Sequence, residues 1–183
     1  MSGQSVYPTP PQLLLPVTPY QVTGRTFGQR VRSRVVLWAR HLGDDVVLSI
    51  GTPVHAIADG SVVWSEVRPG SEDHRNWGGI IVLAHQDKRN GEAFFSLYGH
   101  ITNLTVKEGA DVTAGQTLGV VAPGSSPENG WWKTPHVHFG IYAGPWMSQI
   151  LPGYARPFDG RTKFNWWRSP LPFINEYNKT ENG

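Results

Sequence analysis

Three short segments of the chain combine histidine with residues that support zinc chemistry. They are His41-Leu-Gly-Asp-Asp45, Tyr98-Gly-His100 and His136-Val-His138, and they hold four of the seven histidines. A catalytic zinc ion needs protein ligands from His, Asp or Glu and an open position for water. The chain has no cysteine, so a metal must be held by imidazole and carboxylate.

The spacing of these residues suits strands rather than a helix. In an extended strand, residues two apart point to the same face, so His136 and His138 share a face, and Tyr98 and His100 share another. His41 and Asp45 also share a face if extended, although Gly43 permits a bend between them. The helical zinc motif H-E-x-x-H is absent.

The elements that must position these residues read as short β-branched runs between turn signals. None shows a helical period, and the 21 glycines and 15 prolines favour many turns, so we expect an all-β domain. The turn Asp59-Gly60 predicts a hairpin between the strands on either side of it. The expected strands are Val35–Trp38, Pro53–Ala58, Ser61–Val67, Gly79–Ala84, Glu92–His100, Leu118–Val121 and His136–Tyr142.

A chain of 183 residues fits one domain. Residues 1–33 alternate prolines with polar residues and predict an extended arm. Residues 34–183 then form the single domain, with the motifs in a core of residues 35–142. Residues 143–183 carry five of the prolines and predict an irregular tail that wraps the domain.

The order of the motifs resembles the lysostaphin and LytM family of zinc metallopeptidases, which act on peptidoglycan. The pattern His41-x-Gly43-x-Asp45 is followed by Gly51-Thr-Pro-Val54 and Ala58-Asp-Gly60, then by Tyr98-Gly-His100 and Pro135-His-Val-His-Phe139. Asp44 competes with Asp45, but the spacing to Gly43 favours Asp45 and leaves Asp44 as a solvated turn residue. The resemblance spans roughly residues 35 to 142.

The resemblance implies a fold, a cofactor and residue roles. The fold is a compact antiparallel β-sandwich or hybrid barrel with an open groove. One zinc ion per chain is held by His41, Asp45 and His138, and His100 and His136 act on the attacking water, with His136 as the principal base. The implied activity is hydrolysis of peptide bonds in peptidoglycan cross-bridges or stem peptides. No tyrosine before His41 matches the one that some family members use to stabilise the oxyanion. Residues 64–77 and 125–132 do not resemble the segments that bound the groove in the family.

Composition narrows the partners. A net charge of +2 without a basic stripe argues against nucleic acid, and no apolar stretch is long enough to span a membrane. The start, Met1-Ser-Gly-Gln-Ser, lacks the basic region of a secretory leader. The sequence therefore favours the cytoplasm, whereas the resemblance implies the cell wall through an unseen export route. Oligomeric state is not indicated.

Several alternatives remain beside this interpretation. We expect His55, His74 and His85 to be structural, with His85 the nearest of them to the site. Trp77, Trp131 and Trp132 fall in loops and serve either as an aromatic platform or as core. A non-catalytic wall-binding or regulatory module on the same fold is the alternative function. A lipoyl-carrier-like domain, suggested by the turns of residues 106–119, lacks the lysine that would carry the cofactor.

Overall fold

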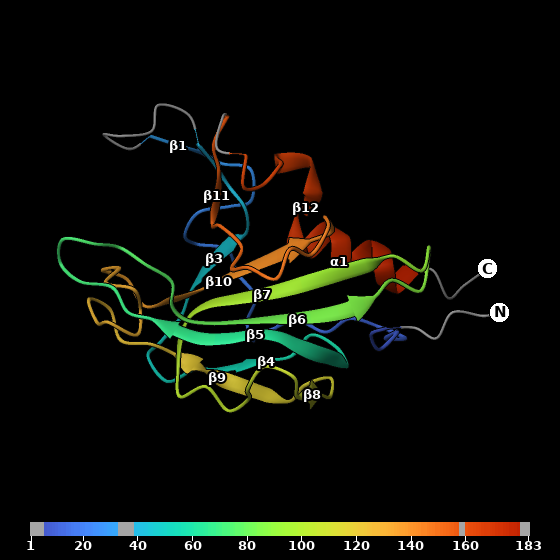
Figure 1. The fold of residues 1–183 in the computed structure, drawn as a ribbon. Helices are drawn as coiled ribbons and strands as arrows, with labels where there is room; N and C mark the ends of the chain where they lie inside the picture. Colours follow the sequence, from blue (N-terminus) through green and yellow to red (C-terminus); the bar gives the residue numbers. More distant parts are fainter. Residues whose placement is uncertain (1–5, 33–38, 158–159, 180–183) are drawn as a thin grey trace.

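The computed structural model describes residues 6–32, 39–157 and 160–179, which form a mostly antiparallel β structure with one α-helix (Figure 1). In chain order the elements are β1 (Arg30–Val31), β2 (Ala39–His41), β3 (Asp44–Val47), β4 (Pro53–His55), β5 (Gly60–Arg68), β6 (Gly78–Gln86), β7 (Ala93–Thr102), β8 (Asp111–Val112), β9 (Thr117–Val121), β10 (His136–Tyr142), β11 (Tyr154–Ala155), the 3-10 turn η1 (Phe164–Trp166), β12 (Trp167–Arg168) and α1 (Pro170–Lys179).

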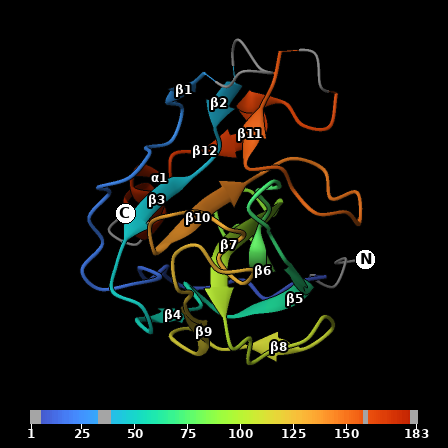
Figure 2. The same cartoon turned by 90° about the vertical axis from the view of Figure 1, so that its left-hand side faces the viewer.

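Nine strands form the main sheet, in which the neighbours run β12-β10-β7-β6-β5-β8 (Figure 2). The strand β3 pairs with β10, and β9 pairs with both β4 and β7. A small second sheet has the order β1-β2-β11. The pairings are antiparallel throughout the described strands, so the prediction of an all-β antiparallel fold is confirmed.

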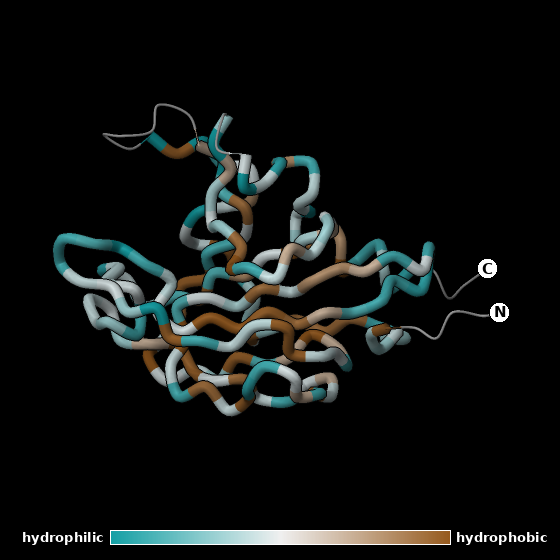
Figure 3. The backbone as a smooth tube through the Cα atoms, viewed as in Figure 1, coloured by the Kyte–Doolittle hydropathy of each residue, from teal (hydrophilic) through white to brown (hydrophobic). Residues whose placement is uncertain are grey.

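Both faces of the main sheet are covered, so β6 is buried on both sides and carries the apolar run of residues 80–84 (Figure 3). Successive residues of β6 alternate between two clusters: Ile81 and Leu83 face a larger core, and Ile80 and Val82 face a smaller one. The arm, β4, β9 and α1 contribute to the larger core. Leu42, Leu151 and Trp167 close the smaller core.

The predicted hairpin at Asp59-Gly60 is wrong. The strand β4 pairs with β9, and β5 pairs with β6 and β8, so the two strands around the turn have different partners. The predicted strand His136–Tyr142 is found with the same bounds as β10, and the other predicted strands are found with shifted ends. Val35–Trp38 lies outside the described residues. A helix that combines the length and the apolar character needed to cross a membrane is absent from the described part of the chain.

The tail was expected to be irregular, but it contains β11, β12 and the ten-residue helix α1. Pro170 and Pro172 led to the prediction of an irregular segment here. Proline is nevertheless tolerated in the first turn of a helix, because the N–H groups of that turn have no partner within the helix. The buried face of the helix carries Phe173, Ile174 and Tyr177. Tyr177 Oη donates a hydrogen bond of 2.7 Å to the Pro10 carbonyl, so the helix holds the arm in place.

Candidate metal centre

Three strands bring His41, Asp45 and His138 together. His41 ends β2, Asp45 lies in β3, and His138 lies directly opposite Asp45 in the pairing of β3 with β10. The chain turns between β2 and β3 at Gly43, where a Cβ atom would lie 2.4 Å from the Phe139 carbonyl oxygen and 2.6 Å from His138 Nε2. Only glycine fits here without a clash. The absence of a side chain at Gly43 lets the turn pack closely against β10, and this brings His41 near Asp45 and His138.

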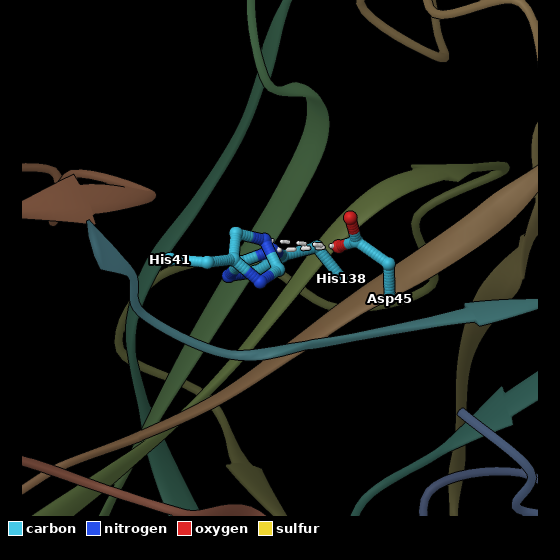
Figure 4. A group of neighbouring side chains, drawn as sticks. All are labelled: His41, Asp45 and His138. Carbon is cyan, nitrogen blue, oxygen red and sulfur yellow. Dashed lines mark hydrogen bonds and ion pairs between the residues drawn. The ribbon is translucent and has the colours of Figure 1, made fainter. Parts of the chain in front are cut away.

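One carboxylate oxygen of Asp45 faces three imidazole rings. Its Oδ1 lies 3.0 Å from His138 Nδ1, 3.2 Å from His41 Nε2 and 3.9 Å from His136 Nε2. Figure 4 shows the His41 and His138 rings directed toward this oxygen. His41, Asp45 and His138 each offer one ligand atom, and these atoms all lie within 4.8 Å of one another. Neighbouring ligands around a tetrahedral zinc are about 3.3 Å apart, which is close to the observed spacing.

Backbone carbonyls fix two of these imidazoles with a lone pair toward the cluster. His41 Nδ1 donates to the Thr26 carbonyl at 3.2 Å, and His136 Nδ1 donates to the Thr134 carbonyl at 2.8 Å. A neutral imidazole bonded in this way keeps the lone pair on Nε2. Two such lone pairs beside a carboxylate oxygen repel it unless a cation lies between them. The residues therefore fit a bound metal ion.

A buried nitrogen without a partner supports the same interpretation. His41 Nε2, which lies 3.2 Å from Asp45 Oδ1, is buried and has no hydrogen-bond partner among the described residues. Buried polar atoms without partners are rare in folded proteins and call for an explanation such as an ion. A carbonyl bond from the other nitrogen, as at His41, is the usual way in which proteins orient a metal-binding imidazole.

The protonation states also suit a metal. Burial alone would raise the pKa of Asp45, but the hydrogen bond with His138 Nδ1 and the interaction with the nearby His41 ring outweigh it and hold the pKa well below its usual range. Burial lowers the pKa of His138 to about 4, against the opposing effect of the Asp45 carboxylate. At neutral pH Asp45 is therefore a carboxylate and His138 a neutral imidazole, which are the forms that bind metal.

His100 reaches the cluster through an irregularity of β7. Gly99 faces the site, since a Cβ there would lie 2.7 Å from the Trp77 ring. Strict alternation would therefore place His100 on the opposite face with Tyr98, which is buried in the larger core. Instead His100 has a φ of 65°, next to a register shift between β7 and β6. The prediction that Tyr98 and His100 share a face is wrong, because this left-handed residue turns the His100 ring into the site.

The His100 ring lies beside the ring of His136, the other residue that is expected to act on the attacking water. Its centroid is 4.6 Å from the His136 ring and 6.3 Å from the His138 ring. Burial, followed by the neighbouring imidazoles His136 and His138, lowers the pKa of His100 well below its ordinary value. Its Nδ1 is buried without a hydrogen-bond partner, and the ring bonds to the backbone of Asn129. All five residues expected in the site thus lie in one cluster.

The cluster lies at the base of an open cavity of about 850 Å³. Trp77 and Trp132 line this cavity, and Trp77 stacks on His100 with ring centroids 5.6 Å apart. The Trp132 indole donates a hydrogen bond of 3.1 Å to the Asn76 carbonyl and so ties the two loops together. Trp131 does not line the cavity. The platform interpretation therefore fits two of the three tryptophans.

Two residues of the site have no signal in the sequence. Tyr154, in β11, places its ring 5.3 Å from the His41 ring. Arg25, in the arm, donates from Nη1 to Tyr154 Oη at 3.0 Å. Arg25 comes from the arm and Tyr154 from the tail, and no site residue was predicted in either segment. Tyr154 pairs with His41 across β11 and β2, and only the tertiary fold reveals this pairing.

Asp44 and His85 differ from expectation. Asp44 is buried rather than solvated, and it accepts hydrogen bonds of 2.9 Å from Tyr20 Oη and the Phe27 N–H, so it fastens the arm to β3. His85 is structural as predicted but lies away from the site. It bonds to the Asp59 carbonyl at 2.7 Å and to Ser96 Oγ at 2.8 Å, and it does not line the cavity.

The sequence and the fold of this chain both match known peptidases. Residues 39–149, which make up more than half of the chain, match peptidase family M23. The chain therefore belongs to this family. It is 32% identical over 101 residues to the peptidoglycan DD-endopeptidase ShyA of Vibrio cholerae, covering 55% of this chain and 20% of that protein. It is 33% identical over 102 residues to the glycyl-glycine endopeptidase ALE-1 of Staphylococcus capitis, and this match covers 54% of this chain and 24% of that protein.

A solved structure agrees over a larger part of the chain. The catalytic domain of lysostaphin from Staphylococcus simulans superposes with a TM-score of 0.54 at 25% identity. The match covers 83% of this chain and 90% of that domain. In contrast, the chain spans only about a fifth to a quarter of the length of the two curated relatives named above.

Proposed function

We propose that this chain is a zinc-dependent metalloendopeptidase that hydrolyses peptide bonds in peptidoglycan cross-bridges or stem peptides. His41, Asp45 and His138 hold the zinc ion. His136 is the principal general base, and His100 assists it. One observation carries the proposal: Asp45 Oδ1 faces three imidazole nitrogens, two of which are fixed as lone-pair donors by backbone carbonyls.

The chemistry divides between the metal and the two remaining histidines. When bound, zinc polarises the scissile carbonyl and acidifies a water molecule. His136 accepts a proton from that water at Nε2, because its Nδ1–H is held by the Thr134 carbonyl. His100 stays neutral in its buried position and exchanges protons at Nδ1, which has no other partner. Trp77, stacked on His100, keeps bulk water from this ring.

The form of the cavity supports an extended peptide as substrate. Its volume of about 850 Å³ is in the range of ligand sites, and it is open rather than enclosed. A folded protein cannot place its backbone against buried donors such as His41, whereas a flexible peptide can. The named relatives act on peptidoglycan or on glycyl-glycine bonds, which supports a wall peptide as the natural substrate.

Digestion of purified peptidoglycan tests this function. Zinc-loaded protein is incubated with walls of defined cross-link chemistry, and the fragments are identified by mass spectrometry. We expect new amino termini within the peptides, none with chelator-treated protein, and none with His136→Ala. Binding to walls without any cleavage would favour the non-catalytic wall-binding module. Cleavage that persists after complete zinc removal would contradict the zinc assignment.

A further inference from the structure

The charged side chains around the metal donors are nearly all of one sign. Five cationic side chains line the cavity, from four separate segments of the chain: Arg25, Arg75, Lys133, Arg156 and Arg161. Among the lining residues that the structure describes, the one carboxylate is that of Asp45, which is turned toward the histidines. The net charge of the whole chain is only +2, so this concentration of positive charge is local. Such a wall attracts anionic groups and repels cationic ones.

Arg25 is the cation that lies deepest in this wall. It is half-buried, whereas Arg75 and Lys133 are exposed. Its backbone runs beside the metal donors, because the Asp45 N–H donates to the Arg25 carbonyl at 2.7 Å. Its guanidinium carbon lies 5.9 Å from the centre of the Trp132 ring, and its Nη1 bonds to Tyr154. The head group is therefore held at a fixed place next to the site.

The guanidinium keeps donors for a ligand. Arginine has five N–H donors, and within the part of the chain that the structure describes, the bond to Tyr154 Oη is the one hydrogen bond that the Arg25 guanidinium makes. Tyr154 in turn lies against His41, so an anion on Arg25 would sit next to the metal donors. A carboxylate matches the planar fork of arginine and binds it through two parallel hydrogen bonds.

On this basis we propose that the groove takes an extended peptide that carries free carboxylates beside the scissile bond, and that Arg25 binds the carboxylate nearest to the metal donors. The inference rests on the proposed peptidase function and narrows its substrate class. A chain of glycine residues alone offers no charge to these cations. Peptides with side-chain or terminal carboxylates are therefore preferred over neutral ones. Arg25 is a specificity-determining residue in this scheme.

A pair of peptides that differ only in charge tests the proposal. Both have blocked ends and a central Ala–Ala bond, and glutamate flanks this bond in one and glutamine in the other. Binding to the zinc-loaded full chain is followed by tryptophan fluorescence, since Trp77 and Trp132 line the groove, and cleavage is followed by mass spectrometry. At low salt we expect roughly tenfold tighter binding of the glutamate peptide. At 1 M salt, where the screening length falls to about 3 Å, the preference should shrink.

Variants assign the preference to the groove. Arg25→Gln should reduce the glutamate preference to about twofold or less. Arg75→Gln combined with Lys133→Gln, both at exposed positions, should also lower it. Lys107→Gln removes the same charge from an exposed position outside the cavity lining and should leave the preference unchanged. A preference retained in Arg25→Gln, as direct binding of the carboxylate to zinc would give, overturns the assignment.

The outcomes separate this inference from the proposed function. Equal affinity and equal cleavage of the two peptides overturns the charge preference and leaves the peptidase function intact. Failure of both peptides to bind also overturns it. Selective binding of the glutamate peptide without cleavage of either peptide or of peptidoglycan supports the anionic groove and contradicts the peptidase function.

Discussion

Asp45 and His138 lie directly opposite each other in the pairing of β3 with β10, with His138 Nδ1 3.0 Å from Asp45 Oδ1. Two of the three donors are therefore fixed by the backbone hydrogen bonds of one sheet. The third, His41, belongs to the small sheet and joins them across the turn at Gly43. Because paired strands hold side chains rigidly, the donor atoms are positioned before any metal binds.

Loss of a donor should empty the site. We expect the purified protein to contain about one zinc per chain, and His138→Ala or Asp45→Ala to contain less than about a tenth of that, because two remaining ligands hold zinc weakly. Metal content is measured by mass spectrometry of the desalted protein. His74→Ala, in an exposed loop, is the matched control and should keep its zinc. Full zinc retention in His138→Ala would refute the ligand assignment.

His100 and His136 should behave differently from the donors. His100→Ala and His136→Ala should keep zinc and lose roughly 10²–10⁴-fold in kcat, as is typical for the loss of a general acid or base. Both quantities are measured on the same protein preparation, with cleavage assayed on purified peptidoglycan. If either substitution releases the metal instead, the roles of base and ligand within the cluster must be exchanged.

The sequence predicted the strands and the five residues of the cluster, since both depend on local patterns. Alternation along β10 correctly placed His136 and His138 on one face. Alternation failed for His100, because a register shift and a positive φ interrupt β7 at this residue. The residue types at this position do not indicate either irregularity. The hairpin at Asp59-Gly60 failed because the two flanking strands do not pair with each other: β4 pairs with the distant strand β9, whereas β5 pairs with β6 and β8.

The parts that could not be predicted depend on contacts between distant segments. Arg25 and Tyr154 are 129 residues apart, and their hydrogen bond exists only because the arm and β11 both lie against the metal cluster. Asp44 was expected in solvent, yet it is buried because Tyr20 and Phe27 of the arm supply its hydrogen bonds. A buried carboxylate of this kind requires partners that a local pattern does not contain.

A methyl group at Gly43 should damage the site. In Gly43→Ala the new Cβ would lie 2.4 Å from the Phe139 carbonyl oxygen and 2.6 Å from His138 Nε2, so β10 must shift. We expect the free energy of unfolding to fall by about 1–3 kcal/mol and the affinity for zinc to fall with it. Both are measured, by denaturant titration and by competition with a chelator.

Gly51→Ala separates the effect on the site from a general loss of stability. Gly51 has a φ of 81° with no atom within 4 Å of its added Cβ, so alanine there costs about 1–2 kcal/mol through the backbone alone. This control should keep normal zinc affinity. Equal zinc affinity in the Gly43 and Gly51 variants would show that the turn at Gly43 does not position His41 against the other two donors.

The buried His85 should make stability depend on pH. Its Nδ1–H donates to the Asp59 carbonyl, so Nε2 accepts from Ser96 Oγ, which accepts in turn from Tyr98 Oη. These bonds require a neutral ring, and burial lowers the pKa of His85 to about 4. The unfolded chain, with a pKa of about 6.5, binds the proton more readily. The stabilisation is therefore complete above about pH 6.5 and is lost as the pH falls toward 4.

Comparison of the wild type with His85→Gln isolates this contribution. The free energy of unfolding of the wild type should exceed that of the variant, and this difference should be largest at pH 7.5. At pH 4 the difference should be smaller by roughly 2–3 kcal/mol, because each unit of pKa shift corresponds to about 1.4 kcal/mol. Urea titrations in chelator measure both proteins at each pH. Titration of the histidines in the candidate metal centre is common to both proteins and cancels in the difference. His74→Gln, at an exposed position, is the matched control. A difference between wild type and His85→Gln that stays constant from pH 7.5 to pH 4 would mean that the buried ring is not held neutral by this network.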